Sequence, residues 1–168
     1  MLISLIFALV YYAINYPLKY KNQINKYALQ YNLSSALVAS VINTESSFDK
    51  NATSIKGACG LMQIMPTTGQ YIAENLGQTF NIDNLYNPDT NIQYGCYYLN
   101  YLFDKFKDQR VVLASYNAGE GVVSNWLKDS RYSQDGVTLQ HIPYQQTRQY
   151  VDKVNQNINI YKNKLKES

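Results

Sequence analysis

The sequence predicts a single, mainly α-helical domain that follows a short apolar segment. Apolar residues recur three, four and seven positions apart in several stretches, which is the spacing of one face of an α-helix. We find no run of alternating apolar and polar residues, the pattern of a half-buried strand. At 168 residues the chain is long enough for one domain with its own core. We therefore expect helices with at most a short β-hairpin.

The first segment, residues 1–18, is apolar and predicts an uncleaved signal anchor or transmembrane segment. No charged side chain precedes Lys19, and three tyrosines lie where an aromatic belt would form at a membrane surface. A small-x-small cleavage site is absent. A buried N-terminal helix is the alternative. Lys19 and Lys21 follow the apolar run while nothing basic precedes it, which argues mildly against export of the following domain.

The remaining elements belong to one predicted domain, residues 19–160. We expect helices over 20–31, over 34–45 with Ser34 as the cap, from Thr67 or Thr68 to Leu76, after the Asn87-Pro88 pair, over 119–128 and over 146–165. Residues 111–116 form a short apolar segment. Irregular loops are expected over 48–60 and 130–144. Residues 161–168 read as a charged tail without a function.

Composition limits the classes of ligand. The net charge is +3, but the basic residues are scattered, so we predict no nucleic-acid partner. Seventeen tyrosines suit the lining of a wet groove, although ordinary packing is an alternative. Cys59 and Cys96 are too few for a disulfide scaffold, which leaves their pairing open. His141 stands without a metal-ligand motif, so we expect no metal and no cofactor.

Glu45 is the candidate general acid. It shares one helical face with Val38, Val41 and Ile42, so its carboxyl is expected on the buried side. Burial disfavours the charged form and raises the pKa of the carboxyl toward neutrality, as proton donation near pH 7 requires. The alternative is that Glu45 merely ends the helix and meets water.

Four segments in this order resemble the catalytic domain of the soluble lytic transglycosylases, a lysozyme-like fold that acts on peptidoglycan. The resemblance extends from about residue 20 to about residue 157. The segments are Glu45-Ser46-Ser47-Phe48, Ser54-Ile55-Lys56-Gly57-Ala58-Cys59-Gly60-Leu61-Met62-Gln63-Ile64-Met65-Pro66, Ser115-Tyr116-Asn117-Ala118-Gly119 and Ile142-Pro143-Tyr144-Gln145-Gln146-Thr147-Arg148-Gln149-Tyr150-Val151. Four motifs in register are far more specific than any one alone.

The resemblance implies that Glu45 acts as the sole catalytic acid and base. It also implies a glycan groove that includes Ser54, Gln63, Met65, Tyr116 and Asn117, with Tyr150 hydrogen-bonded near the catalytic carboxyl. The residue types agree with these roles, because side-chain amides both donate and accept hydrogen bonds and methionines form adaptable apolar walls. Taken singly, each of these positions also has an ordinary packing or turn explanation.

One residue departs from the family pattern. Gln146 stands where the family usually has Glu, and we expect this change to alter binding rather than to abolish chemistry. No convincing second carboxyl accompanies Glu45, since Asp49 follows beyond the expected helix end. A single carboxyl suits a lyase whose substrate supplies its own nucleophile.

Three other accounts remain at this point. One is a lysozyme-type hydrolase with Asp49 holding the attacking water, another a non-catalytic wall-binding protein, and the third a membrane-embedded binding module. The predicted partners are peptidoglycan strands and, through residues 1–18, a membrane, while no protein partner is indicated. We expect the protein in the cell envelope, anchored with its domain facing the wall or secreted.

Overall fold

The computed structural model describes the backbone of residues 2–166 and the side chains of residues 6, 7 and 10–166. Its elements are α1 (Leu2–Asn15), α2 (Lys21–Gln30), α3 (Ser35–Ser46), α4 (Pro66–Asn75), the 3-10 helix η1 (Ile82–Tyr86), α5 (Pro88–Phe106), α6 (Gln109–Ala118), α7 (Glu120–Leu127) and α8 (Gln145–Leu165). The prediction of a mainly helical domain is confirmed. Among the described residues, β-structure is limited to the isolated bridges Thr53 to Cys59 and Cys59 to Ile64.

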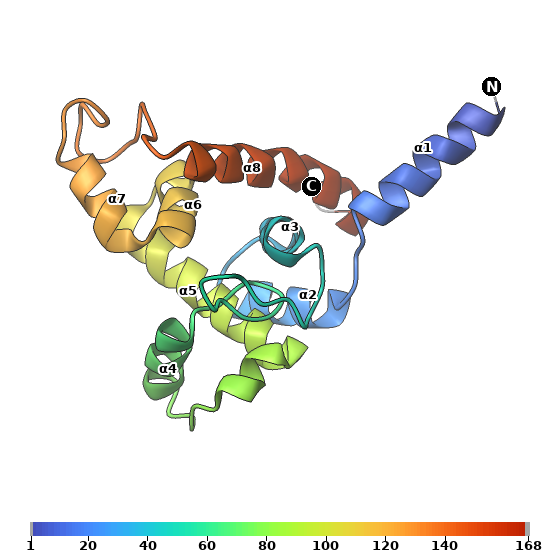
Figure 1. The fold of residues 1–168 in the computed structure, drawn as a ribbon, viewed down its shortest axis with the longest axis horizontal. Helices are drawn as coiled ribbons and strands as arrows, with labels where there is room; N and C mark the ends of the chain where they lie inside the picture. The colour runs from blue at the N-terminus through green and yellow to red at the C-terminus, as the bar shows by residue number, and fades with distance from the viewer. Residues whose placement is uncertain (1, 167–168) are drawn as a thin grey trace.

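Helix α3 lies in the middle of the domain, with α8 along one side and α2 and α5 on the other (Figure 1). Ser34 caps its start as predicted, since its hydroxyl oxygen accepts a hydrogen bond from the Leu37 amide at 3.0 Å. Every residue from Ala36 to Asn43 is buried, so α3 is a core helix that exposes only its last turn. Glu45 lies in that last turn.

The end of α3 is abrupt because Ser47 and Phe48 both adopt left-handed backbone angles, with φ values of 52° and 66°. These two residues turn the chain into the irregular loop over 47–65. The Ser46 hydroxyl then ties the loop back to the helix by donating to the Leu61 carbonyl at 2.8 Å. The loop is thereby held against the turn that carries Glu45.

The side chain of Asn91 on helix α5 holds this loop by hydrogen bonds, and Asn91 is completely buried. Its Nδ2 donates to the carbonyls of Cys59 at 2.9 Å and Leu85 at 2.7 Å, and its Oδ1 accepts from the Met62 amide at 2.7 Å. One turn further on, Gly95 leaves room for Met62, because a Cβ atom at Gly95 would lie 2.2 Å from the Met62 sulfur. The loop therefore rests directly on the helix.

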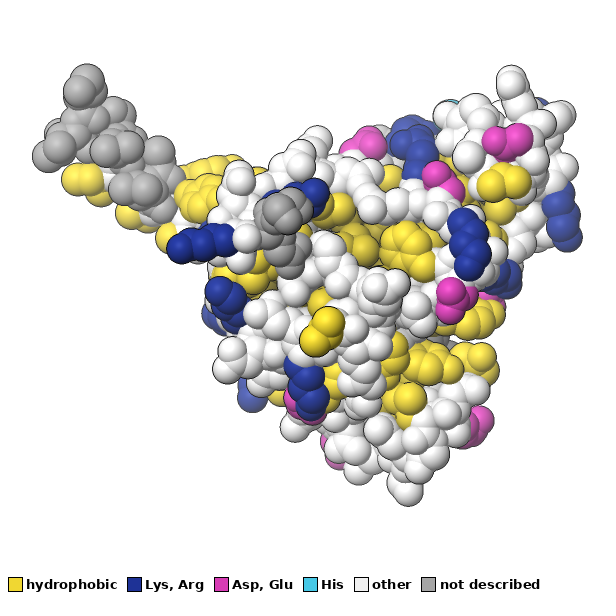
Figure 2. Space-filling model, turned by 180° about the vertical axis from the view of Figure 1, so that it is seen from behind, with side chains coloured by type: hydrophobic (Ala, Val, Ile, Leu, Met, Phe, Trp, Pro, Cys, Tyr) yellow, Lys and Arg dark blue, Asp and Glu magenta, His cyan; other side chains and the backbone are white. Residues whose placement is uncertain are grey.

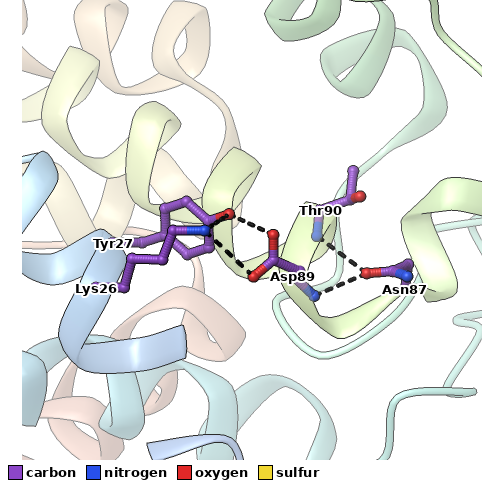
Figure 3. A network of polar contacts seen from close by, with 5 residues as sticks. All are labelled: Lys26, Tyr27, Asn87, Asp89 and Thr90. Carbon is purple, nitrogen blue, oxygen red and sulfur yellow. Dashed lines mark hydrogen bonds and ion pairs between the residues drawn. The ribbon is translucent and has the colours of Figure 1, made fainter. Parts of the chain in front are cut away.

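The first turn of α5 is joined to α2 by a polar network (Figure 3). Asn87 accepts hydrogen bonds from the amides of Asp89 and Thr90, so it is the N-cap that its position before Pro88 predicts. Asp89 accepts a hydrogen bond from the Tyr27 hydroxyl, and Lys26 lies 3.6 Å from the same carboxylate. This network fixes the orientation of α5 relative to α2.

One expectation about the start of a helix needs correction. Helix α4 begins at Pro66 with Met65 at its N-cap position, and neither Thr67 nor Thr68 caps it. Proline at the first helical position sets the start because its φ angle is helical and it needs no partner for an amide hydrogen. Helix α8 ends at Leu165, as predicted, and its residue Tyr161 is fully buried, so the segment expected as a charged tail begins inside this helix. Residues 167 and 168 lie outside the described residues.

Helix α1 extends away from the domain, with the N-terminus at its far end, and the C-terminal end of α8 lies beside its base (Figure 1). The Tyr161 hydroxyl donates to the Pro17 carbonyl at 2.8 Å, and Lys164 donates to the Tyr16 carbonyl. No helix among the described residues combines the length and the apolar character needed to cross a membrane. Cys59 and Cys96 are both free thiols and both buried, so the pairing left open above is not formed.

Candidate active site

A cavity of about 600 Å³ opens between the 47–65 loop and helices α3, α5, α6 and α8. Five of the residues singled out in the sequence line it together with Glu45. The full lining consists of Glu45, Ser54, Ile55, Lys56, Ala58, Gln63, Ile64, Met65, Thr68, Tyr98, Tyr116, Asn117, Ala118, Gly119 and Gln146. The structure thus brings residues from four distant motifs into one hollow.

Glu45 is the only carboxyl among these described lining residues. It is half-buried in the last turn of α3, and the loss of water around it raises the pKa of its carboxyl from 4.5 to about 7. A carboxyl with such a pKa is protonated in a large fraction of molecules near neutral pH and still ionises readily. It can therefore both give and accept a proton under the same conditions.

Tyr150 does not line the cavity but is buried beside Glu45. Its hydroxyl lies close enough to oppose part of the rise in the Glu45 pKa. The two groups nevertheless do not reach the geometry of an ordinary hydrogen bond, and the Tyr150 hydroxyl is buried without a partner in the described chain. A buried hydroxyl with no partner costs free energy, so the Tyr150 hydroxyl does not stabilise the fold by a hydrogen bond.

Tyr116 forms another wall of the cavity near Glu45. Its hydroxyl donates to the Met62 carbonyl at 2.8 Å, and its ring lies 5.6 Å from that of Tyr98. Burial and the neighbouring Glu45 carboxyl hold the Tyr116 pKa well above its usual value, so the phenol stays neutral. Tyr116 therefore joins α6 to the loop and gives the cavity an aromatic side.

Gln63 and Ser54 are positioned by the loop itself. The backbone of Gln63 is left-handed, and its Nε2 donates to the carbonyls of Gly60 at 2.9 Å and Ala52 at 3.2 Å. These bonds use the amide donor, which leaves the Gln63 carbonyl oxygen as the group available to a ligand. The Ser54 hydroxyl oxygen accepts from the Ala58 amide at 2.9 Å and retains its own hydrogen for donation.

Asn117 and Met65 complete the predicted set. The Asn117 side-chain oxygen accepts a hydrogen bond from the Thr147 hydroxyl at 2.9 Å, so its amide nitrogen remains as a donor. Met65 is 38% exposed and lines the cavity, so its side chain offers an apolar surface there. Gln63 and Asn117 therefore offer an acceptor and a donor to the same cavity, a pairing that suits an amide such as an acetamido group.

The cavity continues on both sides, so the site is an elongated groove with Glu45 in its central part. On one side lies a hollow of about 310 Å³ that shares Thr68 and Tyr98 with the main cavity and is lined by Thr67, Thr68, Tyr71, Tyr98, Tyr101 and Glu120. On the other lies a hollow of about 440 Å³ lined by Lys56, Asn117, Ala118, Pro143, Tyr144, Gln145, Gln146 and Thr147. The groove is therefore longer than the main cavity alone.

Sequence reasoning placed neither Tyr98 nor Lys56 in the groove. Tyr98 sits on α5 among residues whose helical spacing predicts core packing, and only the Tyr116 ring beside it reveals its place. Asp49, the possible second carboxyl, is exposed, accepts a hydrogen bond from the Asn51 amide and does not line the groove. Among the described residues, no three His, Cys, Asp or Glu side chains gather in a cluster that could hold a metal ion.

Comparisons with known proteins agree with this geometry. The model of the family "Transglycosylase SLT domain" matches residues 22–139, which include every lining residue except Gln146. The soluble lytic murein transglycosylase of Salmonella typhimurium is 34% identical over 143 residues, covering 83% of this chain and 22% of the relative. The membrane-bound lytic murein transglycosylase C of Glaesserella parasuis is 26% identical over 168 residues, covering 86% and 46%.

A solved structure shows the same fold. An inactive Glu-to-Gln mutant of the lytic transglycosylase Slt from Pseudomonas aeruginosa superposes with a TM-score of 0.81 and 31% identity, covering 92% of this chain and 26% of that one. The chain thus spans about a fifth to a quarter of the length of these soluble relatives. Because the family model matches well over half of the sequence, the chain belongs to the transglycosylase SLT domain family.

Proposed function

We propose that this protein is a lytic transglycosylase that cleaves the β-1,4 bond between N-acetylmuramic acid and N-acetylglucosamine in peptidoglycan. The observation that carries the proposal is Glu45, a carboxyl with its pKa raised to about 7, which is the only carboxyl among the described residues that line the main cavity of the groove. Glycosidases that hydrolyse their substrate use two carboxyls about 5 to 9.5 Å apart. A lyase needs only one, because the substrate supplies the nucleophile.

In the first step, protonated Glu45 donates its proton to the bridging oxygen as the bond from that oxygen to the anomeric carbon breaks. The acetamido oxygen of the muramoyl sugar stabilises the positive charge that develops on the anomeric carbon. N-acetylglucosamine leaves with the proton as its new hydroxyl. Glu45 is now a carboxylate in a site that disfavours its charge, which makes it a competent base.

In the second step, the Glu45 carboxylate removes the proton from the 6-hydroxyl of the same muramoyl sugar. The 6-oxygen bonds to the anomeric carbon and closes a 1,6-anhydro ring. Glu45 is again protonated, and no water is consumed. One carboxyl thereby acts as acid and then as base in a single turnover.

The surrounding residues hold the sugar in place. The Gln63 oxygen and the Asn117 amide nitrogen bind polar groups of the glycan, and the Ser54 hydroxyl adds a further donor. Met65 and Tyr116 form the walls against the sugar ring. Tyr150 orients the Glu45 carboxyl, because its buried hydroxyl has no other described partner and lies next to that group.

Helix α1 attaches the protein to a membrane at the cell envelope, with the groove facing the wall. The exposed apolar side chains of α1 support this attachment, and Phe7 and Ile14 are each 71% exposed. The name of the Glaesserella parasuis relative describes a membrane-bound enzyme. The names of the soluble relatives describe action on murein.

Purified peptidoglycan incubated with the full-length protein tests the catalytic proposal. Released muropeptides are analysed by mass spectrometry, and we expect products lighter by one water than the corresponding reducing muropeptides. The Glu45→Gln variant should release none, since the amide cannot donate or accept the proton. Glu74→Gln is the matched control, because Glu74 is exposed on α4 outside the groove and should leave the yield unchanged.

Three outcomes would contradict the proposal. Reducing ends from the wild type would show hydrolysis. Equal release by wild type and Glu45→Gln would show that Glu45 is not the acid. Folded wild-type protein that binds the glycan without releasing any product would show a wall-binding module.

A further inference from the structure

The α1 helix presents apolar side chains that no part of the domain covers. It projects from one end of the molecule, and the described part of its surface is largely hydrophobic in Figure 2, which views the molecule from behind. The exposed fractions are 54% for Ile6, 71% for Phe7, 49% for Val10, 63% for Tyr11 and 71% for Ile14. A contiguous exposed apolar surface on a small protein marks a site of interaction.

The base of α1 is fixed to the end of α8, so the orientation of the helix is part of the fold. Lys164 donates to the Tyr16 carbonyl, and its ammonium lies 4.4 Å from the centre of the Tyr12 ring. Tyr161 bonds to the Pro17 carbonyl from the core side. These contacts bring residues 16–21 and 161–166 to the same place.

Five lysines gather there, and we call them the basic collar: Lys19, Lys21, Lys162, Lys164 and Lys166. None of them forms an ion pair with another described residue. In sequence, residues 16–21 and 161–168 hold five of the fifteen Lys and Arg of the chain but one of the twelve Asp and Glu, Glu167. The rest of the chain therefore carries a slight net negative charge, and the basic character of the protein is concentrated at the base of α1.

Dark blue side chains are visible on the surface where the projecting helix meets the domain (Figure 2). Lys19, Lys21, Lys162 and Lys166 are exposed, and Lys164 is half-buried against the Tyr12 ring. An apolar helix with cations around its base matches a bilayer with anionic headgroups. The helix can enter the apolar acyl region, and the cations at its base then lie at the level of the charged headgroups. A second copy of the chain is a poorer match, since pairing two α1 helices side by side brings two basic collars together.

We propose that the basic collar binds anionic phospholipid headgroups while α1 enters the hydrocarbon of the same membrane. The inference rests on the membrane attachment proposed above and names the lipid class that this attachment selects. Each lysine near an anionic surface strengthens binding about fivefold. Anionic lipid should therefore strengthen binding well beyond what α1 alone achieves.

The test measures partition of the full-length protein onto vesicles by flotation. One set contains phosphatidylcholine alone, and the other contains phosphatidylcholine with phosphatidylglycerol. We expect binding at least about tenfold tighter to the anionic vesicles, and we expect this preference to shrink as salt is raised. Equal partition onto both sets would overturn the proposal.

Two variants with the same change of net charge distinguish an effect of the basic collar from a general effect of the charge of the protein. Lys19→Gln, Lys21→Gln and Lys162→Gln combined should remove most of the preference for anionic vesicles and leave binding to neutral vesicles unchanged. Lys50→Gln, Lys128→Gln and Lys153→Gln combined make the same change of charge at exposed positions away from α1 and should keep the preference. An equal loss in both variants would show a general charge effect and would contradict the collar.

Two further results would distinguish the lipid preference of the basic collar from the proposed membrane attachment and from the proposed catalytic activity. Binding to neither vesicle set would overturn membrane attachment together with the collar. Self-association in sedimentation without lipid, abolished by Phe7→Asp, would show that α1 pairs with a second copy. Muropeptide release is measured separately and tests the catalytic proposal alone.

Discussion

The Glu45 side chain combines two properties that usually exclude each other in a protein, access to a cavity and loss of water. It ends a core helix whose preceding turns are fully buried, and the loop that follows folds back over it. The carboxyl therefore faces a ligand-sized space while most of its surroundings are protein. This placement explains why the pKa of Glu45 reaches about 7.

The raised pKa makes Glu45 a source of instability at high pH. A carboxyl with a higher pKa in the folded state binds protons more tightly when folded, so its contribution to stability is full below pH 4.5 and is lost as the pH rises through about 7. Glu45→Gln should therefore be more stable than wild type at pH 8.5, by up to about 3 kcal/mol, and similar to it at pH 4.5. Urea unfolding at the two pH values measures this difference, and a constant difference would contradict the assigned pKa.

The same pKa predicts the alkaline limb of activity. Because the first step requires protonated Glu45, kcat/KM should fall about tenfold per pH unit above pH 7. Initial rates of muropeptide release between pH 5 and pH 9 give the profile. A rate that is flat to pH 9 would mean that another group donates the proton.

Tyr150 should act on catalysis by positioning Glu45. Tyr150→Phe removes the hydroxyl that lowers the Glu45 pKa, so the alkaline limb should move to higher pH while kcat falls about tenfold. The free energy of unfolding should change by less than about 1 kcal/mol, because the lost hydroxyl has no described partner.

Tyr161→Phe is the matched control for Tyr150→Phe. Tyr161 is also a buried tyrosine on α8, but its hydroxyl bonds to the Pro17 carbonyl far along the helix. This variant should lose about 1 kcal/mol of stability and keep the wild-type pH profile. A shifted profile in the control, or an unshifted one in Tyr150→Phe, would remove the positioning role.

At the scale of single residues, the sequence predicts which face of a helix a side chain lies on better than it predicts which groups that side chain contacts. The helical spacing of Val38, Val41 and Glu45 places the carboxyl on the buried side, and the structure agrees. The donors and acceptors that remain on Gln63 and Asn117 could not be predicted, because they depend on loop carbonyls and on Thr147 brought in from elsewhere. Which groups in a groove stay available is decided by tertiary structure.

At the scale of elements, the loop over 47–65 positions several residues of the site, and helix α5 holds this loop in place. Asn91 binds the Leu85 carbonyl and the Met62 amide, and it adds a second hydrogen bond to the Cys59 carbonyl, which also accepts from the Ile64 amide. Gly95 gives Met62 its space on the same helix. The loop is therefore rigid although it has almost no regular structure.

Removal of the Asn91 side chain should release the loop. Asn91→Ala leaves the Met62 amide and the Leu85 carbonyl without their partner, while the Cys59 carbonyl keeps the Ile64 amide, so we expect a loss of about 3 kcal/mol in the free energy of unfolding. Muropeptide release should fall in the protein that remains folded, since Gln63 and the loop lose their support. Asn100→Ala on the same helix is the control and should cost less than about 1 kcal/mol, because Asn100 is half-buried and makes no side-chain hydrogen bond with a described residue.

Helices are predictable from this sequence where caps and spacing act locally. Ser34 and Asn87 cap α3 and α5 as their positions predict. The start of α4 differs from the prediction because Pro66 sets the first turn without any side-chain cap. The rigidity of the loop could not be predicted, because its supports, Asn91 and Gly95, come from a helix that begins more than twenty residues later.

At the scale of the whole molecule, the base of α1 and the end of α8 form one surface and the groove forms another. The sequence separates residues 1–18 from a tail at 161–168, but Tyr161 and Lys164 join these segments across the entire chain. Such a contact has no local signature, so only the folded structure reveals the basic collar. An enzyme attached at this surface would keep its groove at a fixed orientation to the membrane.

The central claim, that one carboxyl performs both proton transfers without water, is tested most directly by isotope labelling. The full-length protein digests purified peptidoglycan in water enriched in heavy oxygen, and mass spectrometry reads the new glycan ends. We predict anhydro ends that carry no heavy oxygen. Reducing ends that carry the label would show that water attacks the anomeric carbon, and would contradict the account.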